Sequence, residues 1–226
     1  MTTRRDEAMR AFAWSALAAL ASLSLVSAAA AAPPTAADIA RLCANAEDQA
    51  HCARLIEAKQ IPRVKSFVRR DGDELRIDLL SPGSTTFRDS IDIAGARSYA
   101  LWDYVDDLQS VVLFATRGDR SEFWWVQRQG GGEFRLPSEP VLAPGRRRLA
   151  TADFCENGCT NEVAVWRIEP NDVRKELAFK PPTPWREASV TWKSSDTVVV
   201  EYVANEGAPP QTIERRLGDA DWARMR

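Results

Sequence analysis

The chain has 226 residues, with 30 Lys and Arg against 32 Asp and Glu, and its formal net charge is −2. This length is enough for one or two domains with a sizeable core. The nearly balanced charge gives no argument for a nucleic acid or an anionic membrane surface as a partner, so we expect neither.

The first 32 residues have the features of a secretory signal peptide. Three arginines lie within the first ten residues, an Ala/Leu-rich apolar run covers residues 11–26, and an Ala tract precedes Pro33. Basic start, apolar centre and small residues before a cleavage site are the parts of such a signal. We therefore expect a periplasmic or secreted protein without a stable membrane span after cleavage, with an uncleaved anchor as the alternative.

The four cysteines lie in two local pairs. Cys43 and Cys52 are close in sequence, and so are Cys155 and Cys159. Export to an oxidising compartment favours disulfides. Neither pair has the Cys-x-x-Cys spacing of zinc sites, although four cysteines keep zinc as the competing interpretation. The expected bonds are Cys43–Cys52 and Cys155–Cys159, with no metal.

Two short helices are expected after the linker that begins at Pro33. Apolar residues at helical spacing predict one helix over 36–46 and a second over 47–59, ended by Pro62. The Cys43–Cys52 bond would join them into a hairpin over residues 33–62 that packs on the next domain. His51, the single histidine, is interpreted as a surface residue of the second helix.

From residue 63 to 226 the sequence is typical of a β domain. Short runs rich in Val, Ile, Phe, Tyr and Trp alternate with Gly, Pro, Asp and Ser clusters. Several runs are apolar on both faces, which requires cover on both sides. The expected strands are 64–70, 75–80, 97–104, 110–116, 122–127, 133–136, 147–154, 162–168, 175–179, 188–193, 197–203 and 211–216.

Residues 146–168 predict a hairpin. Asn157-Gly158 lies between two apolar runs, and both residues tolerate positive φ. The Cys155–Cys159 bond would staple its corner. The loop residues Glu156, Asn157 and Gly158 then have two readings, a structural staple or a rigid contact with a protein partner.

An internal repeat links the hairpins. A shift of about forty residues maps 110–116 onto 150–156 and 123–126 onto 163–166, and a shift of about forty-nine continues the pattern to 198–203 and 212–217. Together with the segment 140–150, these units resemble β-propeller blades of WD-repeat or Tol-type periplasmic proteins over about residues 97–217. The resemblance implies four-stranded antiparallel meanders. The fold class expected is mainly β, partly propeller-like or a sandwich, with a disulfide-tied α-hairpin.

No catalytic motif is present, but acidic residues gather after Trp102. Asp103, Asp106 and Asp107 stand beside aromatic residues, as paired carboxylates do in glycan-processing sites. Acidic turn residues are the commoner explanation of such a cluster. A second acidic group, residues 71–74, lacks the later ligands of a calcium loop.

These observations favour an exported binding or protein-interaction module without catalysis of its own, of inhibitor, immunity or envelope-associated type. Its expected partner is a protein of the cell envelope, and no cofactor is expected. Two alternatives stay open: an envelope glycan hydrolase that uses the clustered Asp residues, and a structural subunit of an envelope assembly.

Overall fold

The computed structural model describes residues 34–92 and 95–225, so the predicted signal peptide lies outside the described residues. Two helices open the described chain, α1 (Ala36–Cys43) and α2 (Gln49–Val64). Thr35 caps α1 in a capping box with Asp38, and Asp48 caps α2. The Cys43–Cys52 disulfide joins the two helices, which confirms the predicted hairpin.

The rest of the described chain forms four antiparallel sheets, which confirms the mainly β fold. The sheets follow one another in the sequence, except that the last strand of the described chain returns to the third sheet, and most strands pair with their sequence neighbours. The four described sheets do not form a closed barrel. The first sheet holds β1 (Val68–Asp71), β2 (Glu74–Asp78) and β3 (Ser84–Arg88); the second β4 (Ser90–Asp92), β5 (Gly95–Val105), β6 (Ser110–Arg117), β7 (Arg120–Gln127) and β8 (Glu133–Leu136); the third β9 (Val141–Leu142), β10 (Arg148–Asp153), β11 (Glu162–Glu169), β12 (Asp172–Phe179) and β16 (Ala223–Arg224); the fourth β13 (Glu187–Ser194), β14 (Thr197–Val203) and β15 (Gln211–Arg216).

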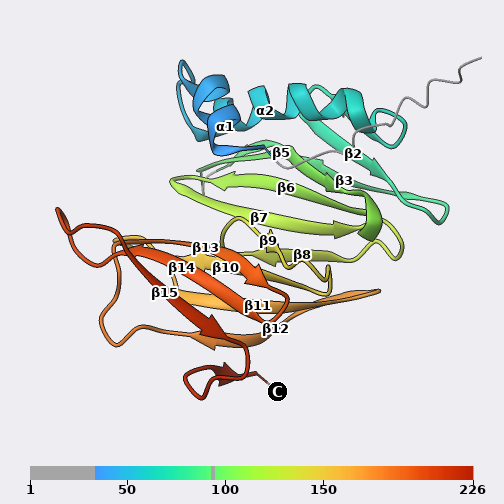
Figure 1. The fold of residues 1–226 in the computed structure, drawn as a ribbon. Helices are drawn as coiled ribbons and strands as arrows, with labels where there is room; N and C mark the ends of the chain where they lie inside the picture. Colours follow the sequence, from blue (N-terminus) through green and yellow to red (C-terminus); the bar gives the residue numbers. More distant parts are fainter. Residues whose placement is uncertain (1–33, 93–94, 226) are drawn as a thin grey trace, which may run out of the picture.

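Each sheet packs on the next one through a hydrophobic core. Leu75 of the first sheet and Leu113 of the second lie in one core, and Trp125 and Leu149 join the second sheet to the third. A further core lies between the third and fourth sheets, around Val165. In Figure 1 the helices lie at one end of this stack, while the fourth sheet and the C-terminus lie at the other. Strands inside such a stack are covered on both faces, as the apolar patterning predicts.

The helix α2 continues past Pro62, so the prediction that this proline ends the helix is wrong. The predicted strand over 64–70 starts correspondingly late, at Val68. Val64 is the last residue of α2, and its side chain is buried in the core between the first and second sheets. Burial of this side chain stabilises the extra turn and offsets the hydrogen bond that proline cannot donate.

The shifts found in the sequence relate antiparallel pairs of consecutive strands, although these pairs hold different places in their sheets. The shift of about forty residues carries β6 and β7 onto β10 and β11, and the next shift carries these onto β14 and β15. Each meander has three to five strands, and not a uniform four. The propeller-like interpretation of these repeats stays a prediction.

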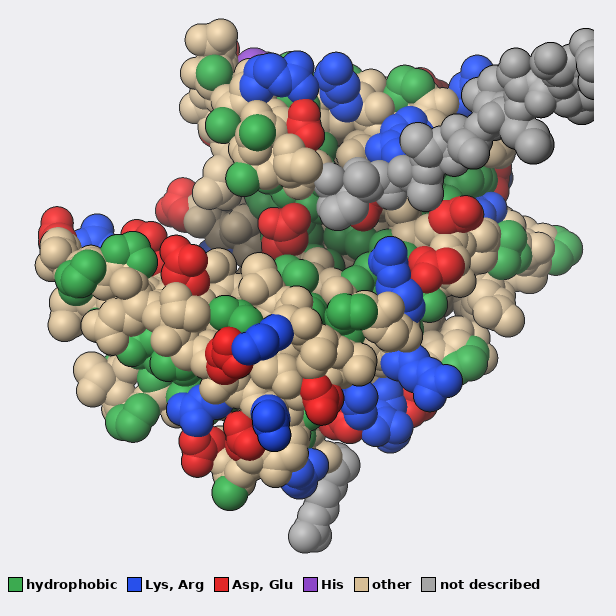
Figure 2. All heavy atoms as spheres, in the orientation of Figure 1, with side chains coloured by type: hydrophobic (Ala, Val, Ile, Leu, Met, Phe, Trp, Pro, Cys, Tyr) green, Lys and Arg blue, Asp and Glu red, His purple; other side chains and the backbone are tan. Residues whose placement is uncertain are grey.

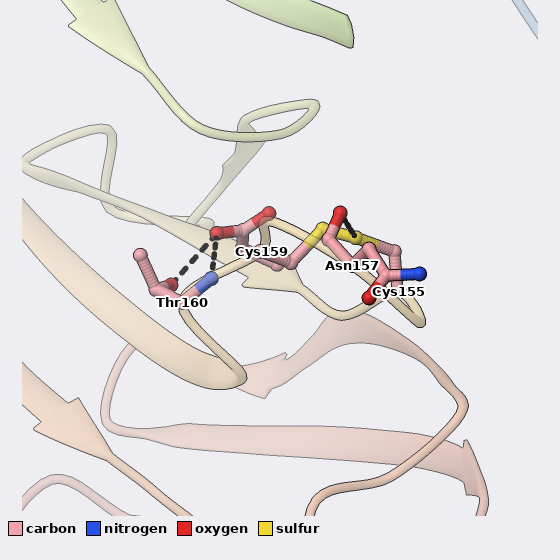
Figure 3. Close-up of a disulfide and its surroundings, with 5 residues drawn as sticks. Cys155, Asn157, Cys159 and Thr160 are labelled. Carbon is pink, nitrogen blue, oxygen red and sulfur yellow. Dashed lines mark hydrogen bonds between the residues drawn. A yellow bond between two sulfur atoms is a disulfide. The ribbon is translucent and has the colours of Figure 1, made fainter. Parts of the chain in front are cut away.

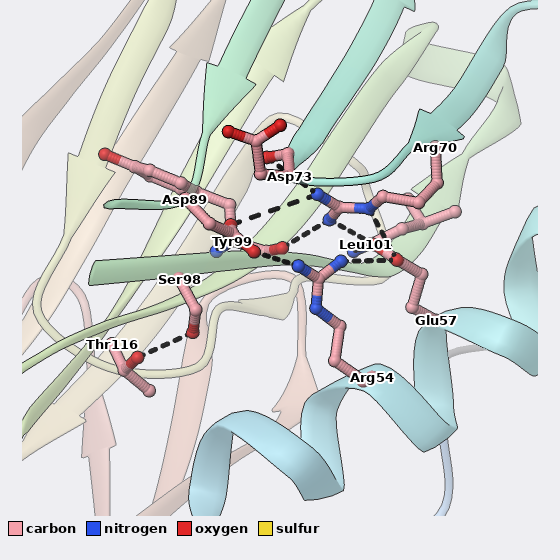
Figure 4. A network of polar contacts seen from close by, with 9 residues as sticks. All are labelled: Arg54, Glu57, Arg70, Asp73, Asp89, Ser98, Tyr99, Leu101 and Thr116. Atoms are coloured by element: carbon pink, nitrogen blue, oxygen red, sulfur yellow. Dashed lines mark hydrogen bonds and ion pairs between the residues drawn. The ribbon is translucent and has the colours of Figure 1, made fainter. Parts of the chain in front are cut away.

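A polar network attaches α2 to β5 beyond the short pairing of that strand with β4, which covers only residues 95–97 of β5. Glu57 is 4% exposed, and its carboxylate accepts hydrogen bonds from Arg54, from Arg70 and from the backbone N–H of Leu101 at 2.8–2.9 Å. Arg70 also donates to the carbonyl of Tyr99 (Figure 4). Side chains thus satisfy edge groups that a neighbouring strand would otherwise bind.

No helix in the described part of the chain is long and apolar enough to cross a membrane.

Candidate functional site

A β-bulge in β5 sets up the candidate site. The pairing with β6 shifts between Leu101 and Asp103, so Trp102 is the extra residue. Leu101 and Tyr104 lie in the core between the first and second sheets. Trp102 packs on the opposite face of β5, in the core between the second and third sheets. Bulges re-aim side chains in this way and are frequent beside functional sites.

A cavity of about 800 Å³ lies beside this bulge. Trp102, Val112 and Trp125 of the second sheet form one part of its wall, and the segment Glu139–Pro144 together with Trp192 forms another. On the face drawn in Figure 2, acidic and hydrophobic side chains lie together in a recess between the helices and the lower sheets. The cavity has the size and the mixed, mainly apolar lining of a small-molecule site.

Asp103 is the buried carboxyl group of this cavity. The residue is 6% exposed, and Oδ1 is buried without a hydrogen-bond partner among the described residues. Burial raises the pKa of Asp103 to about 6, against the backbone N–H of Tyr104 and the charge of Arg63, which lower it, while Glu139 raises it further. A carboxyl group in this setting changes its protonation state near neutral pH.

Trp125 is a second buried polar group in the same wall. Its side chain is fully buried, and the indole Nε1 lacks an acceptor among the described residues. Asp103 pairs with Val112, and Val112 with Trp125, so the three residues form one row across β5, β6 and β7. Neighbouring strands lie about 5 Å apart, so the backbones of Asp103 and Trp125, two strands apart, are separated by about 10 Å. Asp103 offers a hydrogen-bond acceptor at one end of this row, and Trp125 offers a donor at the other.

Charged groups surround the exposed part of the cavity. Asp106, Asp107 and Arg146 line it and are exposed residues, and Glu139 lines it as well. Arg146 pairs with Asp107 at 3.5 Å, and the carboxylate of Glu139 accepts a hydrogen bond from Trp102 Nε1 at 2.8 Å. Desolvation raises the pKa of Glu139 above its usual value. The cavity is therefore acidic overall.

The structure brings the sequence-predicted acidic cluster together. Asp103, Asp106 and Asp107 all line the cavity, together with the aromatic residues Trp102 and Tyr104, which stand beside them in the sequence. Sequence reasoning missed Glu139, Arg146, Trp125 and Trp192, which come from other strands and loops. No local spacing connects these residues with β5, so only the packing of the sheets reveals them.

The stapled loop is a separate feature. The Cys155–Cys159 disulfide is present as predicted. Asp153 closes the loop by accepting hydrogen bonds from the N–H and the hydroxyl of Thr160, both at 2.7 Å. Figure 3 labels Thr160 and draws the two bonds as dashed lines. Residues 154–161 connect β10 to β11, so the connection is longer than a two-residue turn, and Gly158, not Asn157, has positive φ.

The loop residues Glu156, Asn157 and Gly158 are exposed. Glu156 lies 3.8 Å from Arg186, which precedes β13. The side chain of Arg120, at the start of β7, lies against Gly158. The loop thus touches neighbouring sheets on both sides, and its role as a contact with a partner stays a prediction.

Removing this staple should have a modest effect on stability. For the double variant Cys155→Ser/Cys159→Ser, we expect the free energy of unfolding to fall by about 2 kcal/mol, since the bond closes a small ring. Urea denaturation measures this change. The matched variant Cys43→Ser/Cys52→Ser, with the larger separation of 9 residues, should lose about 3 kcal/mol. A larger loss for the smaller ring would contradict the chain-entropy account.

The remaining sequence candidates do not join a site. His51 is exposed, and its Nδ1 accepts a hydrogen bond from the N–H of Glu47 at 3.3 Å, so it closes the start of α2. In the second acidic group, Asp71 ends β1, Asp73 lies in the turn and Glu74 begins β2. Among the described residues, no group of His, Cys, Asp or Glu has the arrangement of a metal site.

Comparison of the chain with models of known protein families, with curated proteins and with solved structures gives no match. The function must therefore be argued from the cavity itself.

Proposed function

We propose that this is an exported, periplasmic binding protein without catalysis of its own, which holds a small ligand in the cavity beside the β5 bulge. The carrying observation is Asp103, a buried carboxyl group in the wall of a cavity of about 800 Å³, with one oxygen that has no hydrogen-bond partner among the described residues. A buried unpaired carboxylate costs stability, and such groups gather where a ligand compensates them.

The composition of the wall supports binding over catalysis. The described residues that line the cavity include no serine, cysteine, histidine or lysine. Nucleophilic catalysis of the Ser–His or Cys–His type needs those groups within hydrogen-bond reach of one another. Three tryptophans, Trp102, Trp125 and Trp192, instead offer large rigid surfaces for an organic ligand.

The two disulfides support the proposed compartment. Such bonds form and persist in the periplasm and outside the cell, and they are rare in the cytosol. The exposed loop Glu156–Gly158 is the surface where we would expect an envelope protein to bind. A pull-down from envelope extract, with the wild type beside Cys155→Ser/Cys159→Ser, tests whether this loop binds an envelope protein. An identical set of captured proteins would count against a role of the loop in binding.

Occupation of the cavity can be tested with a neutral fluorescent dye, N-phenyl-1-naphthylamine. We expect saturable binding to the wild type and binding weaker by about tenfold or more in Leu142→Trp, because the indole fills space in the cavity. Val199→Trp on β14 is the control, since Val199 does not line the cavity, and it should bind like the wild type. Equal binding by all three proteins would contradict the proposal.

A glycan hydrolase is the second candidate, and one observation favours it. The pKa of Asp103 is raised to about 6, the value of a general acid, while Asp106 lines the same cavity and is exposed to solvent. Release of reducing ends from peptidoglycan by the wild type, abolished in both Asp103→Asn and Asp106→Asn, would establish hydrolysis. Such a result would replace the proposal of binding without catalysis.

A further inference from the structure

The chemistry of the cavity also indicates which ligands it accepts. Among the described residues, its charged lining has four carboxylates, from Asp103, Asp106, Asp107 and Glu139, and one guanidinium, from Arg146. Arg146 is already paired with Asp107. An anionic ligand would meet net repulsion, whereas a cation would compensate a charge that the protein leaves buried.

The two buried polar atoms define where the polar groups of a ligand would lie. Asp103 Oδ1 lacks a donor and Trp125 Nε1 lacks an acceptor among the described residues, and the two residues belong to one row across three strands. Between them stands Val112, an apolar contact. The row therefore fits an elongated ligand with a donor at one end, an apolar body and an acceptor at the other end.

We infer that the cavity binds a small protonated organic amine, whose ammonium group pairs with Asp103 and whose hydroxyl or carbonyl oxygen accepts a hydrogen bond from Trp125. This inference rests on the proposed function, because it requires that the cavity holds a ligand. The aromatic wall strengthens the selection, because tryptophan faces attract cations as well as apolar rings. A charge-assisted hydrogen bond to a buried carboxylate is also stronger than a neutral one.

Three related probes test the inference by displacement of the bound dye. Tyramine carries both the ammonium and an oxygen, 4-ethylphenol lacks the ammonium, and 2-phenylethylamine lacks the oxygen. In the wild type we expect tyramine to bind about tenfold or more tightly than 4-ethylphenol and about fivefold more tightly than 2-phenylethylamine. Asp103→Asn should abolish the first preference, and Trp125→Phe the second.

The outcomes separate the two proposals. If the dye binds but 4-ethylphenol equals tyramine, or if Asp103→Asn keeps the preference, the ligand class is wrong and the cavity still binds ligands. Failure of all three probes to displace a bound dye leads to the same conclusion. Absence of dye binding to the wild type removes the proposed function as well. Thermal unfolding of each variant shows whether it is folded.

The dependence of binding on pH gives an independent readout. Tyramine stays protonated, while Asp103, with a pKa of about 6, loses its proton as the pH rises, so tyramine affinity should increase about tenfold between pH 5 and pH 7. The charged side chains that act on Asp103 are Arg63 from α2, Glu139 and Arg146. Asp103→Asn should flatten the profile, and a flat profile in the wild type would overturn Asp103 as the anchor.

Discussion

Replacing Asp103 by Asn should stabilise the ligand-free protein at pH 8 by about 3 kcal/mol and should leave its stability nearly unchanged below pH 4. The pKa of Asp103 is raised from 3.8 to about 6, mainly by burial, so ionisation is harder in the folded protein than in the unfolded chain. Its contribution to stability is fully present below pH 3.8 and is lost as the pH rises to about 6. Asparagine keeps the shape and cannot ionise.

Urea denaturation of both proteins across this pH range measures the difference. Asp119→Asn, at an exposed position in the turn between β6 and β7, is the matched control and should change stability by about 0.5 kcal/mol or less. A less stable Asp103→Asn protein at pH 8 would show that the carboxylate is a satisfied structural group. A stabilised variant that no longer binds tyramine would show that stability is given up for the site.

Replacing Glu57 by Ala should lower the free energy of unfolding by about 3–5 kcal/mol. The substitution removes a carboxylate that is 4% exposed and leaves Arg70, with a side chain 15% exposed, without its main partner. It also leaves the N–H of Leu101 at the edge of β5 without an acceptor. Both losses act on the contact between α2 and the second sheet, so the helical hairpin should detach first.

Two comparisons make this prediction specific. Glu57→Gln keeps an oxygen for the N–H of Leu101 but removes the charge, so we expect an intermediate loss. Arg41→Ala is the control, because it breaks the Arg41–Asp38 pair, which has the same i,i+3 spacing as Arg54–Glu57 but has side chains 63% and 44% exposed, and it should have little effect on stability. If Glu57→Ala lowered the free energy of unfolding no more than Arg41→Ala does, the polar network around Glu57 would add little to stability.

The strands were predictable from sequence because short apolar runs bounded by turn residues are local signals. The ranges 133–136, 197–203 and 211–216 match β8, β14 and β15 residue for residue. The missed strands β3, β4, β9 and β16 are short or polar, and they exist because a neighbouring strand pairs with them. Pairing is a tertiary property, so such strands leave little trace in the sequence.

The candidate site was predictable only in part, for a similar reason. Asp103 and Trp102 are adjacent in sequence, so their combination could be noticed there. That both line the same cavity depends on the β-bulge, which is visible only in the pairing with β6. Glu139 and Trp125 reach the cavity from the loop before β9 and from β7, because the second and third sheets pack together.

The sequence by itself determined the mainly β class, the helical hairpin and both disulfides, because each depends on patterns or spacings within a few residues. The tertiary structure decided the stack of four sheets, the continuation of α2 through Pro62 and the cavity. The physical reason is that long-range packing determines which faces meet and which polar groups lose contact with water. The burial of Asp103, on which the proposed function depends, follows from that packing and from no local feature of the chain.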